Sequence, residues 1–320
     1  MNYNINYNIE IIIIIIIIIL FYLILSFLNY NDYYQRIMKN RLVRDYTKWI
    51  LSDKYIAKKY AEHYGFNVPE TFQLVKYPKQ IDFNSLKKRG NYVIKPTDLC
   101  DSYGIYLVKN NKNLKTNQPI QEQDVINQLY KIRSTIYTEY HMHDEMYNGR
   151  VPFTGYIVEE LLLNQKGEVP DDYKCYTFNG RIYYIANTYN RRVVDEEQLF
   201  DCCWYNRDLE PIKTPMTKKN YKYNKEKLAR TQKEKETFNK MISLVENVSS
   251  KLKRHCRIDV YIIKEQIYLG EFTFFTGAQL HTNYCNYKLG RLWSKYPDDN
   301  SFTDPVLPSL VPEDYYNPIN

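Results

Sequence analysis

Residues 257–273 read RIDVYIIKEQIYLGEFT, and this stretch decides how the rest of the chain is interpreted. Its Ile, Val, Tyr, Leu and Phe residues are typical of β-strands. We expect a hairpin with the three-residue loop Lys264-Glu265-Gln266, in which Asp259 lies opposite Glu271 on one face. Two carboxylates directly opposite each other repel, so the hairpin needs a compensating group.

The same register places Arg257 opposite Thr273, on the face that carries the two acids. A divalent cation is a natural compensating group because hard cations bind carboxylate oxygens. Asp259, Glu271 and the Thr273 hydroxyl would then hold a metal, with Arg257 beside it for a phosphate. The alternative is a solvent-facing hairpin whose acids are hydrated and paired with Arg257. A different loop length would also break the predicted register.

Other charged residues lie at the ends of apolar strands. Lys95 ends the strand predicted at 91–96, where a lysine can meet a phosphate as a point charge. A second apolar strand is predicted at 155–163, and its backbone around Glu159 and Glu160 could bind an adenine at a sheet edge.

A hairpin is predicted at 170–189, around the turn dipeptide Asn179-Gly180. Period-two alternation places Asp172, Lys174 and Tyr176 on one face of its first strand. A lysine in so apolar a strand usually meets an anion. Arg191 and Arg192 follow the hairpin and are candidates for binding a substrate carboxylate, or are simply solvated loop arginines.

Helices are predicted to segregate from antiparallel hairpins. Helical spacing occurs at 31–64, 121–132 and 233–254, whereas strand patterns occur in pairs. This order is typical of an α+β fold rather than of regular βαβ winding.

Composition is that of an ordinary globular protein of 320 residues, with 25% charged residues and a net charge of +7. The basic residues are scattered or interleaved with acids, so no nucleic-acid partner is expected. The six cysteines form no CxxC pair, which argues against a zinc site and favours a reducing compartment.

The N-terminal segment 9–28 reads IEIIIIIIIIILFYLILSFL, long and apolar enough to predict one transmembrane helix. No basic residue precedes it and no small-residue cleavage site follows, so we expect a retained anchor rather than a signal peptide. Arg36, Lys39, Arg41 and Arg44 follow it. The positive-inside rule therefore predicts a single-pass membrane protein whose body faces the cytoplasm.

The succession VIKP, IVEELL, DYKCYTFNG and RIDVYII…IYLGEFT resembles the ATP-grasp superfamily, and in particular the TupA-like ATP-grasp family of teichuronopeptide biosynthesis and polysaccharide gene clusters. The resemblance covers about residues 50–290. It implies an ATP-grasp fold, in which two α+β lobes with antiparallel sheets hold a nucleotide between them.

The resemblance also implies roles for individual residues. Lys95 would bind the α- and β-phosphates of ATP, and Lys174 would be a second basic residue on the nucleotide side. Arg257 would steady the transferred phosphoryl group. The remaining roles belong to an adenine hinge and to Mg²⁺ ligands. The hinge would be Glu159, Glu160, Leu161 and Leu162, and the ligands would be Asp259, Glu271 and Thr273.

Two departures from the family pattern bear on turnover. Thr273 stands where many members have Asn. The loop 96–104 offers only Gly104, together with the acids Asp98 and Asp101, where glycine-rich backbone usually approaches the phosphates.

The family chemistry would be ATP-dependent carboxylate–amine ligation through an acyl phosphate, acting on a carboxylated sugar or peptide acceptor. A catalytically degraded ATP-grasp binding module is one alternative. A nucleotide-sugar glycosyltransferase, with Asp171-Asp172 or Asp298-Asp299 binding a metal, is another, and so is a structural membrane protein without a ligand.

The expected organisation has five parts. They are an anchor at 1–30, a helical lead-in at 31–90, a small lobe at 91–163, a large lobe with the metal site at 164–295, and a loop-rich tail at 296–320.

Overall fold

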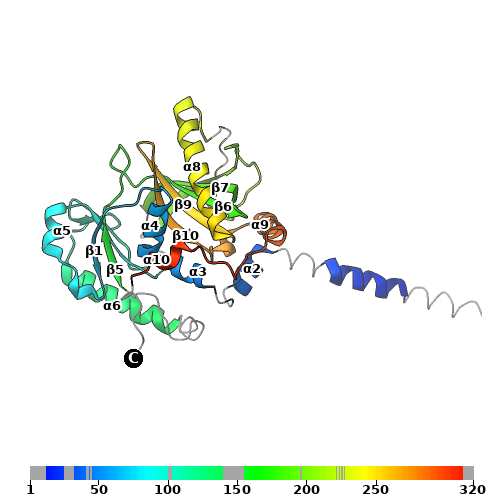
Figure 1. Cartoon of the computed structure of the whole chain (residues 1–320), viewed down its shortest axis with the longest axis horizontal. Coiled ribbons are helices and arrows are strands. Elements are labelled where there is room, and N and C mark those ends of the chain that lie inside the picture. The colour runs from blue at the N-terminus through cyan, green and yellow to red at the C-terminus, as the bar shows by residue number, and fades with distance from the viewer. Residues whose placement is uncertain are drawn as a thin grey trace, which may run out of the picture.

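A computed structural model gives the architecture of the chain (Figure 1). It describes residues 12–24, 32–40, 43, 45–99, 103–139, 155–194, 197–220, 222, 224, 226 and 228–312. Two antiparallel five-stranded sheets form the body, which confirms the α+β expectation.

The first sheet has the strand order β1-β5-β2-β3-β4. Its strands are β1 (Thr71–Val75), β2 (Tyr92–Pro96), β3 (Tyr106–Lys109), β4 (Lys112–Asn113) and β5 (Tyr156–Glu159). Helices α5 (Phe83–Arg89) and α6 (Glu122–Glu139) lie on the same side of the molecule as this sheet (Figure 1), and its core contains Leu86, Val125 and Leu129. The apolar segment predicted as a strand to residue 163 leaves the sheet at Glu159.

The second sheet has the order β10-β9-β6-β7-β8. Its strands are β6 (Asp172–Phe178), β7 (Arg181–Val194), β8 (Glu197–Asn206), β9 (Cys256–Ile263) and β10 (Gln266–Thr273). The predicted Asn179-Gly180 turn joins β6 to β7, with φ of 48° and 73° at its two residues. Both residues adopt the left-handed region that this tight turn requires.

Helices cover both faces of the second sheet. One core contains residues of α3 (Tyr46–Leu51), α4 (Lys54–His63) and α8 (Gln232–Leu252). The other core contains residues of α2 (Tyr33–Asn40) and α9 (Asn283–Lys295). The short helix α10 (Val306–Ser309) adds Leu307 to the first of these cores. Each of the three cores of the body is built from residues C-terminal to position 32.

Helix α4 connects the two sheets. Asp53 caps its N-terminus by accepting from the amides of Tyr55 and Ile56 at 2.9 and 3.0 Å. After the helix the chain passes Asn67, which pairs with β10. The Asn67 amide donates to the carbonyl of Ile267 at 2.9 Å, and the Leu269 amide donates to the carbonyl of Asn67 at 3.0 Å. The chain then enters β1 of the first sheet. The segment 31–90, expected to be a helical lead-in, therefore also supplies an edge strand.

The β9–β10 hairpin differs from its predicted form near the turn. Its loop has two residues, Lys264 and Glu265, with φ of 48° and 67°, so Gln266 pairs with Ile263 rather than lying in the loop. A bulge at Gly270 then shifts the register by one residue. Asp259 therefore lies opposite Glu271 as predicted, and Arg257 opposite Thr273.

The expected membrane span at 9–28 lies only partly within the described residues, where 12–24 form one helix. No helix in the described ranges combines the length and apolar character needed to cross a bilayer.

Candidate nucleotide and metal site

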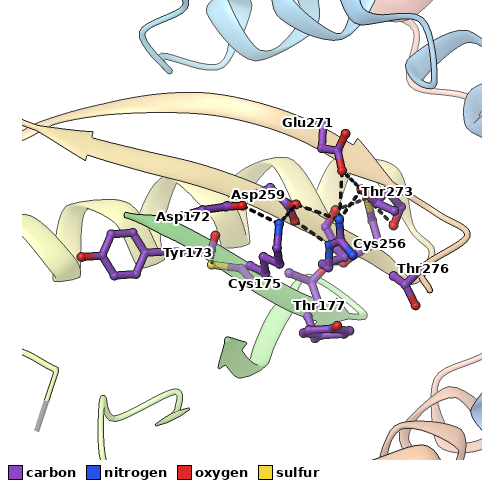
Figure 2. A network of polar contacts seen from close by, with 12 residues as sticks. Asp172, Tyr173, Cys175, Thr177, Cys256, Asp259, Glu271, Thr273 and Thr276 are labelled. Atoms are coloured by element: carbon purple, nitrogen blue, oxygen red, sulfur yellow. Dashed lines mark hydrogen bonds and ion pairs between the residues drawn. The ribbon is translucent and has the colours of Figure 1, made fainter. Parts of the chain in front are cut away.

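A cluster of charged side chains occupies one face of the second sheet (Figure 2). We call this the charge network. Strand β9 carries Arg257 and Asp259, β10 carries Glu271 and Thr273, and β6 carries Lys174 directly opposite Asp259. The bulge at Gly270 brings Glu271 and Thr273 to this face, since without it the register set at the turn would place their neighbours there.

Arg257 lies at the centre of the charge network. Its Nε and Nη2 donate to the two oxygens of Asp259, both at 2.7 Å. Nη2 also donates to Glu271 Oε1 at 2.9 Å and to Thr273 Oγ1 at 3.0 Å. The two facing carboxylates are thus compensated by one guanidinium, and all four residues predicted for this site meet at one point.

Lys174 adds a second cation. Its ammonium donates to Asp259 Oδ2 at 2.7 Å and to Asp172 Oδ2 at 2.5 Å. Burial would lower the pKa of Lys174, but the carboxylates of Asp172 and Asp259 raise it. The lysine therefore remains charged and meets the anion that its apolar strand led us to expect.

Glu271 is the accessible member of the charge network, with 45% of its side chain exposed, whereas Asp259 is 3% exposed. Desolvation would raise the pKa of Glu271, but Arg257, Lys174 and a 2.8 Å hydrogen bond from Thr273 lower it to about 2. A carboxylate held ionised at the surface of the site is suited to bind a cation.

The residues present fit a magnesium ion bound together with a nucleotide. Mg²⁺ commonly uses one or two carboxylates and completes its shell with water and substrate phosphates. Glu271 and Asp259 would supply the carboxylates, and Thr273 a neutral oxygen. The described ranges contain no cluster of three or more His, Cys, Asp or Glu side chains suited to hold a metal without such help.

The charge network continues across the sheet to β7. Arg191 Nη2 donates to Asp172 Oδ2 at 2.8 Å. Its position depends on a bulge between Tyr189 and Arg192, where Asn190 has a φ of 50°. From the sequence we expect Arg191 and Arg192 to follow the hairpin, but both belong to β7, which continues to Val194. Arg191 reaches Asp172 from this strand, and the side chain of Arg192 lies outside the described residues.

A second cluster of cations lies on the first sheet and on α4. Glu159 is 4% exposed and pairs with both Lys95 and Lys58, the latter at 2.9 Å. Burial would raise the pKa of Glu159, but the two ammonium groups lower it. Lys54 lies one turn before Lys58 and donates to the carbonyl of Leu99. We call Lys54, Lys58 and Lys95 the lysine cluster.

Charges of both the charge network and the lysine cluster act on Lys54. Burial lowers the pKa of Lys54, and the charges of Glu271 and Lys95 both act on it. Sequence reasoning did not select Lys54 or Lys58. Their spacing of four on α4 places them on one helix face, and Lys58 falls among the buried residues Ile56, Ala57 and Tyr60, which was the available signal.

The predicted hinge residues divide into two kinds. The carboxylate of Glu159 forms ion pairs with Lys58 and Lys95, so a ligand would have to share it with these two lysines. The backbone from Glu160 to Leu162 is irregular, with Leu161 6% exposed and the Glu160 amide donating to Glu70 at 2.9 Å.

In the loop after β2, the negative charge of Asp98 is neutralised, so it would repel a phosphate less than the sequence suggested. Arg133 binds both oxygens of Asp98, at 3.0 and 2.8 Å. Asp101 lies outside the described residues. Gly104 has a φ of 69°, and a Cβ there would lie 2.9 Å from the Pro96 ring, so glycine is required where the loop returns to the sheet.

The acids considered for a glycosyltransferase metal site have other partners. Asp298 accepts from the Lys48 ammonium at 2.7 Å, the His255 amide at 2.7 Å and the Trp293 indole at 2.9 Å. Asp172 is bound by Lys174 and Arg191. The geometry therefore does not favour that alternative.

Comparison with known proteins identifies the family. The profile of the family described as TupA-like ATPgrasp matches residues 34–291. This chain belongs to the TupA-like ATP-grasp family. The match covers both sheets, the charge network and the lysine cluster, and the resemblance inferred from sequence is confirmed. No match was found among curated proteins.

Three solved structures are similar to the chain at low identity. The D-alanine–D-alanine ligase from Bacillus anthracis is 17% identical with a TM-score of 0.44, over 77% of this chain and 67% of that one. The ATP-grasp ligase PsnB, solved with Mg and ADP, is 10% identical with a TM-score of 0.39, over 82% and 61%. Biotin carboxylase from Campylobacter jejuni is 10% identical with a TM-score of 0.45, over 81% and 48%. The chain spans about two thirds or less of these proteins.

Proposed function

We propose that this ATP-grasp protein is an Mg²⁺- and ATP-dependent ligase that joins a carboxylate to an amine. The observation that carries the proposal is the pairing of Arg257 with the half-exposed Glu271, whose carboxylate that arginine helps to keep ionised. Cations suited to phosphates lie on α4 and the first sheet, and carboxylates suited to a metal lie on the second sheet.

The roles of the residues follow from their charges. Lys95 and Lys54 would neutralise the phosphates, and Asp259, Glu271 and Thr273 would hold Mg²⁺, which supplies charge stabilisation on the phosphoryl oxygens. Arg257 would neutralise the transferred phosphoryl group. Lys174 keeps Asp259 ionised and in place. The backbone at 160–162 would accept the adenine.

The reaction would consume ATP, a carboxylate and an amine. An acceptor carboxylate oxygen attacks the γ-phosphorus, the bond to the bridging oxygen breaks, and ADP leaves. An amine then attacks the acyl carbon of the resulting acyl phosphate, phosphate leaves, and the amine loses a proton. The protein mainly positions and neutralises the reactants.

We propose that the acceptor is a carboxylated sugar or peptide of a surface glycan or glycopeptide. Arg191 would bind its carboxylate because the bulge at Asn190 directs this arginine to the charge network. We also propose that residues 9–28 anchor the protein with its body in the cytoplasm. Release of the full chain from membranes by carbonate at high pH, without detergent, would contradict the anchor.

A binding module without turnover remains the second candidate. Arg257 lies between Asp259 and Glu271, so a metal must share these carboxylates with a guanidinium. ADP release in the presence of acceptor would exclude this candidate. Stabilisation by MgATP without any ADP release would support it.

The first experiment is thermal unfolding of residues 31–320 with and without MgATP. A ligand at 100 times its Kd stabilises the native state by about 2.7 kcal/mol. We expect stabilisation that requires Mg²⁺ and is lost in Glu271→Gln. Glu265→Gln, in the turn of the same hairpin, is the control and should keep the shift. A folded protein that shows no shift at millimolar MgATP would overturn the proposal.

A further inference from the structure

The two adjacent helices α2 and α9 carry basic residues and no acidic ones. Helix α2 reads YYQRIMKN and α9 reads NYCNYKLGRLWSK, so together they carry five basic residues and no acid. The basic residues are Arg36, Lys39, Lys288, Arg291 and Lys295. The whole chain has 44 basic and 37 acidic residues, so two adjacent helices without an acid concentrate much of its net charge of +7.

The two helices are fixed to each other and to the second sheet. Tyr33 and Ile37 of α2 are 0% and 1% exposed and lie in one core with Leu289 and Trp293 of α9. The Arg36 guanidinium donates to Ser294 Oγ at 2.6 Å. The chain that precedes α2 therefore joins the body at α9.

Among the described residues, the preceding helix belongs to no apolar core of the body. Residues 12–24 are each at least 50% exposed, and they belong to none of the three cores. In Figure 1 this helix extends from the α2–α9 end of the molecule, clear of both sheets. Eight residues separate it from Tyr33. An extended chain of that length reaches about 30 Å, so the apolar helix and the α9 surface stay close.

The exposed face of α9 carries its cations at helical spacing. Lys288, Arg291 and Lys295 follow one another at intervals of three and four, on the same side of the helix. Exposed or half-buried tyrosines accompany them: Lys288 lies 5.4 Å from the ring of Tyr284 and Arg291 5.8 Å from that of Tyr287. Basic and aromatic side chains together are typical of surfaces that contact lipid headgroups.

We propose that the exposed face of α9, extended by Lys39 of α2, docks on the headgroups of an anionic phospholipid bilayer. The charge complements that of the lipid, and the exposed apolar helix lies within a short tether of the same surface. The α9 face would thus hold the body against the membrane. Strand β10 ends at Thr273 and α9 begins at Asn283, so the second sheet is close to α9 along the chain. Docking of α9 would orient this sheet toward acceptors at the bilayer surface.

The test separates this contact from the apolar helix. Residues 31–320 contain all three cores, so the body can be purified without the helix, and its fold checked by thermal unfolding. We expect it to float with vesicles of phosphatidylcholine that contain 30% phosphatidylglycerol, but not with pure phosphatidylcholine. Lys288→Gln, Arg291→Gln and Lys295→Gln together should lower the partition coefficient roughly a hundredfold.

A matched control lies at the other end of the molecule. Lys87, Lys88 and Arg89 end α5, far from α9 in Figure 1, and their triple replacement by Gln removes the same charge. This control should bind vesicles as the unmodified body does. Equal losses in both variants, binding to pure phosphatidylcholine, or tighter binding to single-stranded RNA than to the anionic vesicles would overturn the proposal. Because the assay contains no nucleotide, its outcome is independent of the ligase proposal.

Discussion

The Lys174 ammonium donates to the Asp259 carboxylate across two neighbouring strands, at 2.7 Å, and the two residues are direct partners in the β6–β9 register. Asp259 is 3% exposed and would otherwise depend on Arg257 alone. This ion pair therefore joins two strands of the second sheet and also holds a carboxylate of the charge network in place.

Lys174→Met should destabilise the protein. The substitution removes the positive charge that pairs with the buried carboxylates of Asp172 and Asp259. Breaking a buried ion pair costs about 3 kcal/mol. We expect the free energy of unfolding, measured by urea denaturation, to fall by about that amount. Lys235→Met, on the exposed side of α8, should change it by less than about 0.5 kcal/mol. Equal values for the two variants would contradict the role given to Lys174.

Gly270→Ala tests the bulge. A Cβ there would lie 3.0 Å from the carbonyl oxygen of Asp259 and 3.2 Å from the ring of Tyr261. The backbone of β9 must yield, so we expect a loss of about 1–2 kcal/mol and a weaker thermal shift with MgATP, because Glu271 moves. At Gly277 a Cβ meets nothing closer than 3.9 Å, and Gly277→Ala should behave as the unmodified protein. An intact MgATP shift in Gly270→Ala would show that the bulge does not position the site.

The hairpin shows how far sequence reasoning could go. The opposition of Asp259 and Glu271 was predicted from a three-residue loop, but it arises from a two-residue turn followed by a bulge. Lys264-Glu265 lacks the Asn-Gly or Asp-Gly signature that made the other hairpin predictable. A glycine inside an apolar strand was the available sign of the bulge.

The contact of Lys58 with Glu159 was beyond prediction for a different reason. Lys58 and Glu159 are 101 residues apart in sequence, and they meet because α4 and β5 pack together. The local sequence pattern predicts which face of α4 is buried, but it does not predict which carboxylate will pair with a lysine on that face. Individual strands and the polar face of the hairpin follow from local chemistry, whereas contacts between elements depend on how the two sheets are joined.

The pH dependence of stability should report on Glu271. Its pKa is lowered to about 2 in the folded protein, so it contributes stability above the unfolded pKa of about 4.3 that is lost as the pH falls toward 2. The shift alone corresponds to about 3 kcal/mol, but the side chain is nearly half exposed and solvent screening reduces this to about 1 kcal/mol. Glu271→Gln should therefore lower the urea midpoint most at pH 6 and clearly less at pH 3, and the difference should vanish only below pH 2. A difference of the same size at both pH values would mean that the ion pairs do not set it.

Glu159→Gln should destabilise the protein through the lysine cluster. Glu159 compensates Lys58 and Lys95, and both ammonium groups are largely buried, so the loss should be about 3 kcal/mol at pH 7. Burial already lowers the pKa of Lys58, and removing Glu159 lowers it further. A lysine with a lowered pKa loses its buried charge as the pH rises, so the penalty should shrink between pH 7 and pH 10. Glu160→Gln, one residue later and exposed, should cost little at either pH. If the penalty of Glu159→Gln were the same at pH 7 and pH 10, its cause would be packing rather than the uncompensated charge of the two lysines.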